Sequence, residues 1–288
     1  MSYLQRLFAG AFVISTFVFV ASCATTDAEE PKFSGTVAVA SAHPLATQAG
    51  IDVLHNGGNA FDAAIAVAAS LGVVEPYSAG LGGGGFWLLY DAKTNDYRFV
   101  DAREKAPMAA GRDYYLDENG NVDRDRAING PSAAGIPGQP AAFAYLAEKY
   151  GKLPLTTTLA AAITQARDGF PVDAHYQKLM GYRLDAINRY SESARLFLDD
   201  GTVPAVGYLL IQKDLARTLE TIANDGFDGF YRGPIAQTLV NDVTRNGGDW
   251  TLNDLASYNV VERDPIRVML GDTEFISAPP PSSGGIAI

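Results

Sequence analysis

Residues 57–76 read Gly-Gly-Asn-Ala-Phe-Asp-Ala-Ala-Ile-Ala-Val-Ala-Ala-Ser-Leu-Gly-Val-Val-Glu-Pro, and this stretch predicts a deeply buried helix. Asn59 can cap the helix, and the helix dipole favours the carboxylate of Asp62 in the first turn. From Ala60 to Val74 the segment is apolar nearly all round and contains no Lys or Arg, so we expect burial on several sides. Glu75-Pro76 ends the helix, because the residue before a proline is disfavoured in the α region.

Hydrophobic periodicity and turn residues predict the elements around this helix. Further helices are expected at His43–His55, Gln139–Tyr150, Leu159–Gly169, about Leu179–Tyr190, Asp214–Asn224 and Pro234–Asn246, with a short helical turn at Asn253–Leu255. Strands are expected at Ser34–Ser41, Phe86–Tyr90, Tyr97–Asp101, Ile266–Leu270 and Thr273–Ser277. The sequence shows no internal repeat and no low-complexity linker, so residues 34–288 are predicted to form one continuous unit.

The composition allows a sizeable core and argues against two classes of partner. Of the 288 residues, 47% are apolar and 19% charged, as in a folded protein. The net charge of −11 does not suit a phosphate backbone, so nucleic acid is excluded as a partner. The three histidines, His43, His55 and His175, are far apart, and neither HExxH nor CxxC occurs. We therefore predict no metal site.

The N-terminus has the charge-then-apolar order of a secretory signal. Arg6 precedes an apolar run, Leu7–Ala21, whose roughly 15 residues are too few for a comfortable membrane span, which needs roughly 20. The run ends in Val20-Ala21-Ser22-Cys23, which resembles the lipobox of bacterial lipoproteins and implies cleavage before Cys23 and lipid attachment to its thiol. We accordingly predict a signal peptide at 1–22, a lipid-attachment cysteine with a polar tether at 23–33, and an exported protein anchored on the periplasmic side of a membrane. The alternative is an ordinary signal whose only cysteine is incidental.

A run of glycines at 80–85 contains the pattern G-x-G-x-x-G without the context that a nucleotide site needs. Dinucleotide binding requires a strand before the glycines and a helix after them. Here a helix precedes and a strand follows, and no Walker lysine is present. We interpret the run as close backbone packing at a tight entry into a central strand, a loop that can border a substrate pocket.

Arg103 is the candidate substrate-binding residue. It lies in Asp101-Ala102-Arg103-Glu104-Lys105-Ala106-Pro107, at the end of a predicted strand. The planar fork of a guanidinium suits a carboxylate, but from these residues alone a structural ion pair of Arg103 with Asp101 or Glu104 is the stronger interpretation.

Other hydroxyl residues offer no supported nucleophile. Thr156-Thr157-Thr158 are predicted to form the cap and first turn of the helix that follows, and Ser282-Ser283 lie in a Pro-Gly turn. G-x-S-x-G is absent, so a serine hydrolase of the nucleophile-elbow type is not supported.

Ten segments, in order, resemble the γ-glutamyltranspeptidase family. They are His43–Thr47, Gly57–Ala64, Val74–Pro76, Gly82–Phe86, Asp101–Pro107, Ile136–Gly138, Tyr150–Leu153, Gly169–Val172, Gly229–Gly233 and Pro279–Gly285. The resemblance implies an α+β fold of the N-terminal nucleophile hydrolase type, an αββα sandwich, here incomplete because residues 34–288 correspond to part of the large subunit. It also implies that the arginine at position 103 binds the α-carboxylate of the γ-glutamyl group, which reverses the interpretation above.

In the family, a threonine at the start of a small subunit attacks the γ-glutamyl amide of glutathione, with its own α-amine as base, and the γ-glutamyl group passes to water or an amino acid. We expect that threonine beyond the end of this chain, so these 288 residues are predicted to be inactive alone, and no cofactor is implied. The expected partners are glutathione and other γ-glutamyl compounds, the small subunit, and a membrane through Cys23. The alternatives are a related acylase (cephalosporin-type or poly-γ-glutamate transpeptidase) and a non-catalytic γ-glutamyl-binding lipoprotein.

Overall fold

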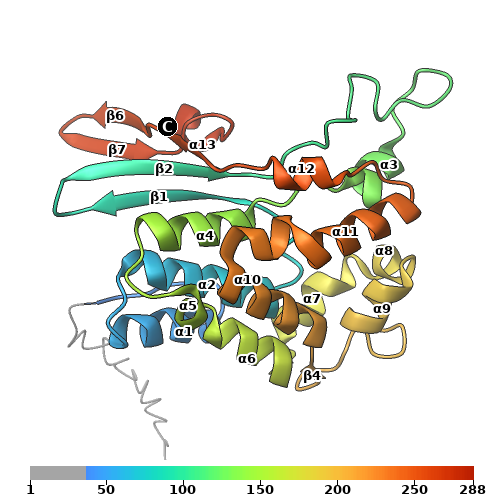
Figure 1. The fold of residues 1–288 in the computed structure, drawn as a ribbon, viewed down its shortest axis with the longest axis horizontal. Helices are drawn as coiled ribbons and strands as arrows, with labels where there is room; N and C mark the ends of the chain where they lie inside the picture. The colour runs from blue at the N-terminus through green and yellow to red at the C-terminus, as the bar shows by residue number, and fades with distance from the viewer. Residues whose placement is uncertain (1–36) are drawn as a thin grey trace, which may run out of the picture. The chain divides into compact units, whose positions relative to one another are not determined.

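The structure, a computed structural model, describes residues 37–288 (Figure 1). Its longer helices are α1 (Pro44–His55), α2 (Ala60–Val74), α4 (Gln139–Lys149), α6 (Ala160–Asp168), α7 (Ala174–Gly181), α10 (Lys213–Tyr231) and α11 (Gly233–Arg245). The shorter helical segments are α3 (Arg124–Ile128), a 3-10 turn (Pro131–Ala133), α5 (Leu155–Thr158), α8 (Leu184–Asn188), α9 (Ser191–Phe197), α12 (Leu252–Ala256) and α13 (Gly284–Ala287). The strands are β1 (Gly85–Asp91), β2 (Asp96–Ala102), β3 (Phe170–Pro171), β4 (Leu209–Leu210), β5 (Val261–Arg263), β6 (Ile266–Leu270) and β7 (Thr273–Ser277). The predicted signal peptide, Cys23 and the tether lie outside the described residues.

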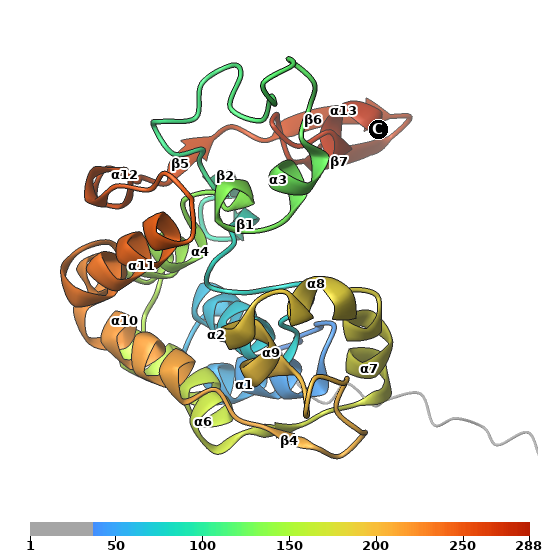
Figure 2. The same ribbon diagram turned by 90° about the vertical axis from the view of Figure 1, so that its right-hand side faces the viewer.

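Helix α2 is the centre of the helical part, as its sequence predicts. It packs against α1, α4, α5 and α6, and Ile65, Ala69 and Val73 are buried on it (Figures 1 and 2). Its N-terminus carries a capping box, in which the Asn59 side chain accepts from the first turn and the Asp62 carboxylate accepts from the backbone N–H of Asn59 at 2.8 Å.

Asp62 also ties α2 to a turn 90 residues further along the chain. Its side chain is fully buried and accepts hydrogen bonds from the backbone N–H groups of Lys152, at 3.0 Å, and Leu153, at 3.4 Å. Gly151 makes this approach possible, because a Cβ atom there would lie 2.7 Å from an Asp62 oxygen. Asp62, which completes the capping box of α2, therefore also fixes the turn between α4 and α5.

A three-stranded antiparallel sheet has the order β1-β2-β5, and its strands β1 and β2 lie above α4 and α2 in Figure 1. Its inner face packs on α4, where the Trp87 and Phe143 rings meet edge to face with centroids 6.3 Å apart. Glu262 of β5, opposite Val100 of β2 in the register, lies on the same inner face. Among residues 37–288, β1 is an edge strand of this sheet. The glycine run therefore leads into an edge strand of the described sheet, and not into a central one as predicted.

The outer face of β1 is apolar and open. Phe86, Leu88 and Tyr90 are 36%, 46% and 47% exposed. The β6–β7 hairpin lies on this side of the sheet, opposite α4, and the Arg267 guanidinium stands 5.1 Å from the Tyr97 ring (Figure 1). The hairpin thus covers only part of the outer face.

Strand β5 is joined to the end of α4 by a charged network. The Glu262 carboxylate accepts hydrogen bonds from the Tyr150 hydroxyl and from Lys149 Nζ, the latter at 2.7 Å. Burial alone would raise the pKa of Glu262, but the hydrogen bonds from Lys149, Tyr150 and Tyr145 outweigh it and lower that pKa to about 2. The carboxylate therefore stays charged and holds β5 to α4 over the physiological pH range.

Most of the predicted elements are found in the structure, and the differences have local causes. The helix predicted at about Leu179–Tyr190 is wrong: Asp173 caps an earlier helix, α7, which ends at Gly181, and α8 follows separately. No strand is present at residues 37–41, the described part of the strand predicted at Ser34–Ser41, and the Val39 side chain lies instead against Gly50 of α1.

Two further helix boundaries were also placed wrongly. Helix α10 continues past Asn224 to Tyr231, across a kink at Gly226, whose φ of 58° places it in a conformation that glycine adopts readily. Thr156, Thr157 and Thr158 belong to a separate turn, α5, rather than to the helix that follows. Among residues 37–288, no helix combines the length and apolar character required to span a membrane.

Candidate functional site

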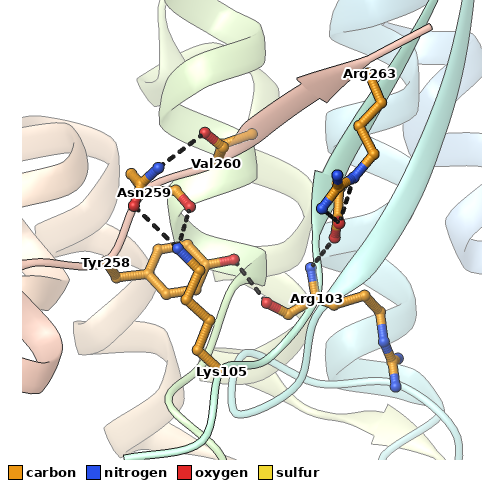
Figure 3. A network of polar contacts seen from close by, with 7 residues as sticks. Arg103, Lys105, Tyr258, Asn259, Val260 and Arg263 are labelled. Carbon is orange, nitrogen blue, oxygen red and sulfur yellow. Dashed lines mark hydrogen bonds and ion pairs between the residues drawn. The ribbon is translucent and has the colours of Figure 1, made fainter. Parts of the chain in front are cut away.

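Arg103 is the first residue after β2, and its main chain is held at both ends. Its backbone N–H donates to Asp101 Oδ1 at 3.1 Å, and its carbonyl oxygen accepts from the Tyr258 hydroxyl at 2.8 Å (Figure 3). Burial, with the charges of Asp101 and Glu104 nearby, raises the pKa of Tyr258, so the phenol keeps the proton that it donates. The position of the Arg103 backbone is therefore fixed from two directions.

The Arg103 side chain, in contrast, is half exposed. Its guanidinium pairs with Glu104 at 3.3 Å and lies 5.6 Å from the centre of the Phe86 ring. Figure 3 shows it directed away from the ion pair that Arg263 forms with Asp101. Of the two ion pairs considered from the sequence, the structure contains the one with Glu104, because Arg263 occupies the Asp101 carboxylate at 2.9 and 3.0 Å.

Glycines let other backbone segments approach this strand end closely. A Cβ atom on Gly84 would lie 2.4 Å from the Ala102 carbonyl oxygen and 2.9 Å from the Arg103 carbonyl carbon. A Cβ atom on Gly138 would lie 2.0 Å from the same Ala102 oxygen. The loop is bound directly, since the backbone N–H of Gly138 donates to the Gly83 carbonyl at 2.9 Å. The interpretation of the glycine run as close backbone packing at a strand entry is confirmed, and the loop lies beside Arg103.

The Lys105 side chain, two residues after Arg103, is held in place by Asn259. Its Nζ donates to the backbone and side-chain oxygens of Asn259, at 3.0 and 2.9 Å, and stands 4.9 Å from the Tyr258 ring (Figure 3). Its backbone exchanges hydrogen bonds with Ile136. Because Lys105 is engaged in this way, Arg103 is the cation of the segment that remains available to a ligand.

Two of the other hydroxyl candidates, Thr158 and Ser282, make local structural hydrogen bonds. Thr158 is fully buried and its hydroxyl donates to the Leu155 carbonyl within α5. Ser282 accepts from the backbone N–H of Gly284 in the turn before α13. In the part of the chain that the structure describes, no three His, Cys, Asp or Glu side chains are grouped so that they could hold a metal ion.

Sequence reasoning missed Tyr258 and Arg263, the residues that hold Arg103 and Asp101. They lie 155 and 162 positions after their partners, in a stretch with no motif among those singled out. No local signal in the sequence identifies these two contacts.

Comparison with sequence families and curated proteins gives consistent matches. The sequence model of the family described as gamma-glutamyltranspeptidase matches residues 46–288. The chain is 42% identical over 251 residues to the glutathione hydrolase proenzyme of Escherichia coli K12. This match covers 87% of this chain and 43% of the relative. The glutathione hydrolase proenzyme of Bacillus subtilis 168 is 39% identical over 249 residues, which covers 86% and 42%. The chain thus spans less than half the length of these curated relatives.

Solved structures show the same likeness. The γ-glutamyltranspeptidase of Helicobacter pylori matches with a TM-score of 0.85 and 38% identity, covering 87% of this chain and 72% of that chain. A Bacillus anthracis transpeptidase matches with a TM-score of 0.73 and 34% identity, covering 87% and 78%. A Bacillus halodurans cephalosporin acylase matches with a TM-score of 0.70 and 33% identity, covering 79% and 43%. The predicted α+β fold of the N-terminal nucleophile hydrolase type is confirmed.

Proposed function

The chain belongs to the γ-glutamyltranspeptidase family, and from that premise we propose that the full-length protein cleaves the γ-glutamyl amide of glutathione and passes the γ-glutamyl group to water or to an amino acid. The substrates are then glutathione and other γ-glutamyl compounds. The bond-breaking nucleophile, which the family resemblance implies to be an N-terminal threonine, is assigned to no residue of this sequence. The residue proposed to bind the substrate is Arg103.

The observation that supports this proposal is the half-exposed guanidinium on a fixed backbone. Arg103 has five N–H donors in a planar fork, and Glu104 is the only carboxylate among residues 37–288 that pairs with it. A substrate α-carboxylate can therefore receive two parallel hydrogen bonds from the outer side of the fork. That contact would orient the γ-carbonyl toward the nucleophile without entering the bond-breaking step.

A panel of three anilides tests the proposed substrate. The γ-glutamyl anilide carries both an α-amine and an α-carboxylate, the glutaryl anilide lacks the amine, and the 4-aminobutyryl anilide lacks the carboxylate. We expect the full-length protein to prefer the γ-glutamyl anilide over both analogues, with glutathione competing. A higher kcat/KM for the glutaryl anilide would instead indicate an acylase. Binding of glutathione without turnover of any anilide would indicate a non-catalytic γ-glutamyl-binding protein.

The outer face of β1 is the proposed contact for a second subunit. Phe86, Leu88 and Tyr90 are each more than a third exposed, and they alternate along β1 so that they share one face. An apolar sheet face of this kind is typically covered by another layer. A small subunit that carries the nucleophile would cover it and would stand beside Arg103, because Phe86 already lies under the Arg103 guanidinium.

We also propose that the protein is exported and held at a membrane through Cys23. The motivation is the sequence Val20-Ala21-Ser22-Cys23 at the end of a short apolar run. At least two acyl chains are needed, because one chain gives only marginal binding. Mass spectrometry of the mature N-terminus is expected to show Cys23 as the first residue with acyl chains attached. Cleavage at another position, or an unmodified Cys23, would contradict the proposal.

A further inference from the structure

We propose that Tyr258 is a positioning residue for Arg103, which sets the place where the guanidinium meets the carboxylate of the substrate. This inference rests on the proposed function, in which Arg103 binds that carboxylate. Tyr258 does not touch the substrate; it acts through the Arg103 backbone, whose carbonyl oxygen accepts its hydroxyl at 2.8 Å. It lies in none of the segments that suggest the family.

Tyr258 is well suited to this role because its ring is itself immobilised. The ring is stacked on that of Tyr231 with centroids 5.4 Å apart and an angle of 14°, and Tyr231 is stacked in turn on Phe227 at 4.3 Å. The Tyr231 hydroxyl donates to the Pro137 carbonyl at 2.7 Å and accepts from the Ala141 N–H at 3.2 Å. The Tyr258 ring is therefore fixed to the end of α10 and the start of α4.

The lack of a side chain at Gly138 leaves room for the Tyr258 hydroxyl to reach the Arg103 carbonyl oxygen. A Cβ atom at position 138 would lie 2.3 Å from that hydroxyl oxygen. The backbone of Gly138 has φ −113° and ψ −24°, which any residue can adopt. Glycine is thus required by the close approach of Tyr258 and Ala102 rather than by backbone conformation.

The backbone N–H of Arg103 is held as well, by Asp101. Asp101 accepts the Arg103 N–H with one oxygen and the Arg263 guanidinium with the other. With its N–H and its carbonyl both bound, Arg103 can move mainly in its side chain, which is directed past Phe86. Tyr258 and Arg263 are only five positions apart. One segment of the chain therefore supplies both residues that fix the Arg103 backbone, Tyr258 directly and Arg263 through Asp101.

The experiment compares Tyr258→Phe with a matched control in the full-length protein. Tyr176→Phe removes the same kind of contact elsewhere, because the buried Tyr176 hydroxyl donates to the Phe197 carbonyl at 2.9 Å. The readout is the ratio of kcat/KM for the γ-glutamyl anilide to that for the 4-aminobutyryl anilide, which reports recognition of the carboxylate. Both variants are also measured in an Arg103→Ala background.

We expect Tyr258→Phe to raise KM for the γ-glutamyl anilide and to lower the ratio by about three- to tenfold, the range for loss of one hydrogen bond, with kcat little changed. Tyr176→Phe should leave the ratio unchanged, and Tyr258→Phe should have no further effect on the ratio in the Arg103→Ala background.

Two outcomes would overturn the inference, and a third separates it from the proposed function. A ratio for Tyr258→Phe equal to that for Tyr176→Phe would show a purely structural role. A full effect of Tyr258→Phe in the Arg103→Ala background would show that Tyr258 does not act through Arg103. If Arg103→Ala alone leaves the ratio unchanged, the assignment of Arg103 as the carboxylate ligand fails, and the positioning role falls with it.

Discussion

Replacing Arg103 with alanine is expected to lower kcat/KM for a γ-glutamyl anilide by roughly 10- to 150-fold in the full-length protein. The range corresponds to about 1.5–3 kcal/mol for hydrogen bonds to a charged group. The backbone contacts of Arg103 with Asp101 and Tyr258 do not involve its side chain, so the strand end should remain in place. Steady-state kinetics with the γ-glutamyl and 4-aminobutyryl anilides measure the effect, and only the first substrate should lose activity.

Two further variants make the Arg103 result specific. Arg103→Lys keeps the charge but loses the planar fork, so it should also be impaired. Arg98→Ala removes an arginine from β2, the strand that precedes Arg103, where it pairs with Asp96 and Asp264 on the surface, and it should leave the kinetics unchanged. Equal kinetics for the wild type, Arg103→Ala and Arg103→Lys would refute the assignment of Arg103 as the carboxylate ligand.

Replacing Asp62 with alanine is expected to have the largest effect on stability, about 3 kcal/mol or more. The substitution removes the fully buried carboxylate that accepts from the backbone N–H groups of Asn59, Lys152 and Leu153, at roughly 1 kcal/mol or more for each lost acceptor. Both the N-terminus of α2 and the turn between α4 and α5 lose their support. Thermal denaturation should show a midpoint lowered by about 6 °C or more, at roughly 2 °C or more for each kcal/mol.

The control for Asp62 is an aspartate on the neighbouring helix. Asp52 of α1 is exposed, and among residues 37–288 its side chain accepts from Gln48 alone, so Asp52→Ala should shift the midpoint little. Asp62→Asn keeps one acceptor oxygen but turns an amide NH₂ group toward backbone donors, so it should fall between the two alanine variants. A midpoint for Asp62→Ala no lower than that for Asp52→Ala would contradict the role assigned to this carboxylate.

The elements that could be predicted from the sequence are those whose causes are local. The bounds of α2 follow from a cap at Asn59, an apolar run and a proline, all within 20 residues, and the β6–β7 hairpin follows from alternation about a short turn. The helix predicted across Gly181 failed because the cap at Asp173 and a glycine decide its ends more strongly than periodicity does.

The geometry of the site could be predicted only in part, because distant residues compete for the same groups. From residues 101–104 alone, Asp101 and Glu104 are equivalent partners for Arg103. The structure distinguishes them through Arg263, which lies 162 positions away and occupies Asp101. Such competition depends on the folded arrangement of β2 and β5, and no local pattern encodes it.

The distance along the chain between Arg103 and Tyr258 also has a consequence for biosynthesis. The two residues are 155 positions apart, so at roughly 5–20 residues per second the ribosome delivers Tyr258 about 8–30 s after Arg103. During that interval the β1–β2 hairpin and the bond of the Arg103 N–H to Asp101 can form, because these contacts are local, but Tyr258 and Arg263 have not yet been made. The arginine proposed to recognise the substrate therefore reaches its final position only after the segment that contains Tyr258 and Arg263 has been made and has joined the sheet.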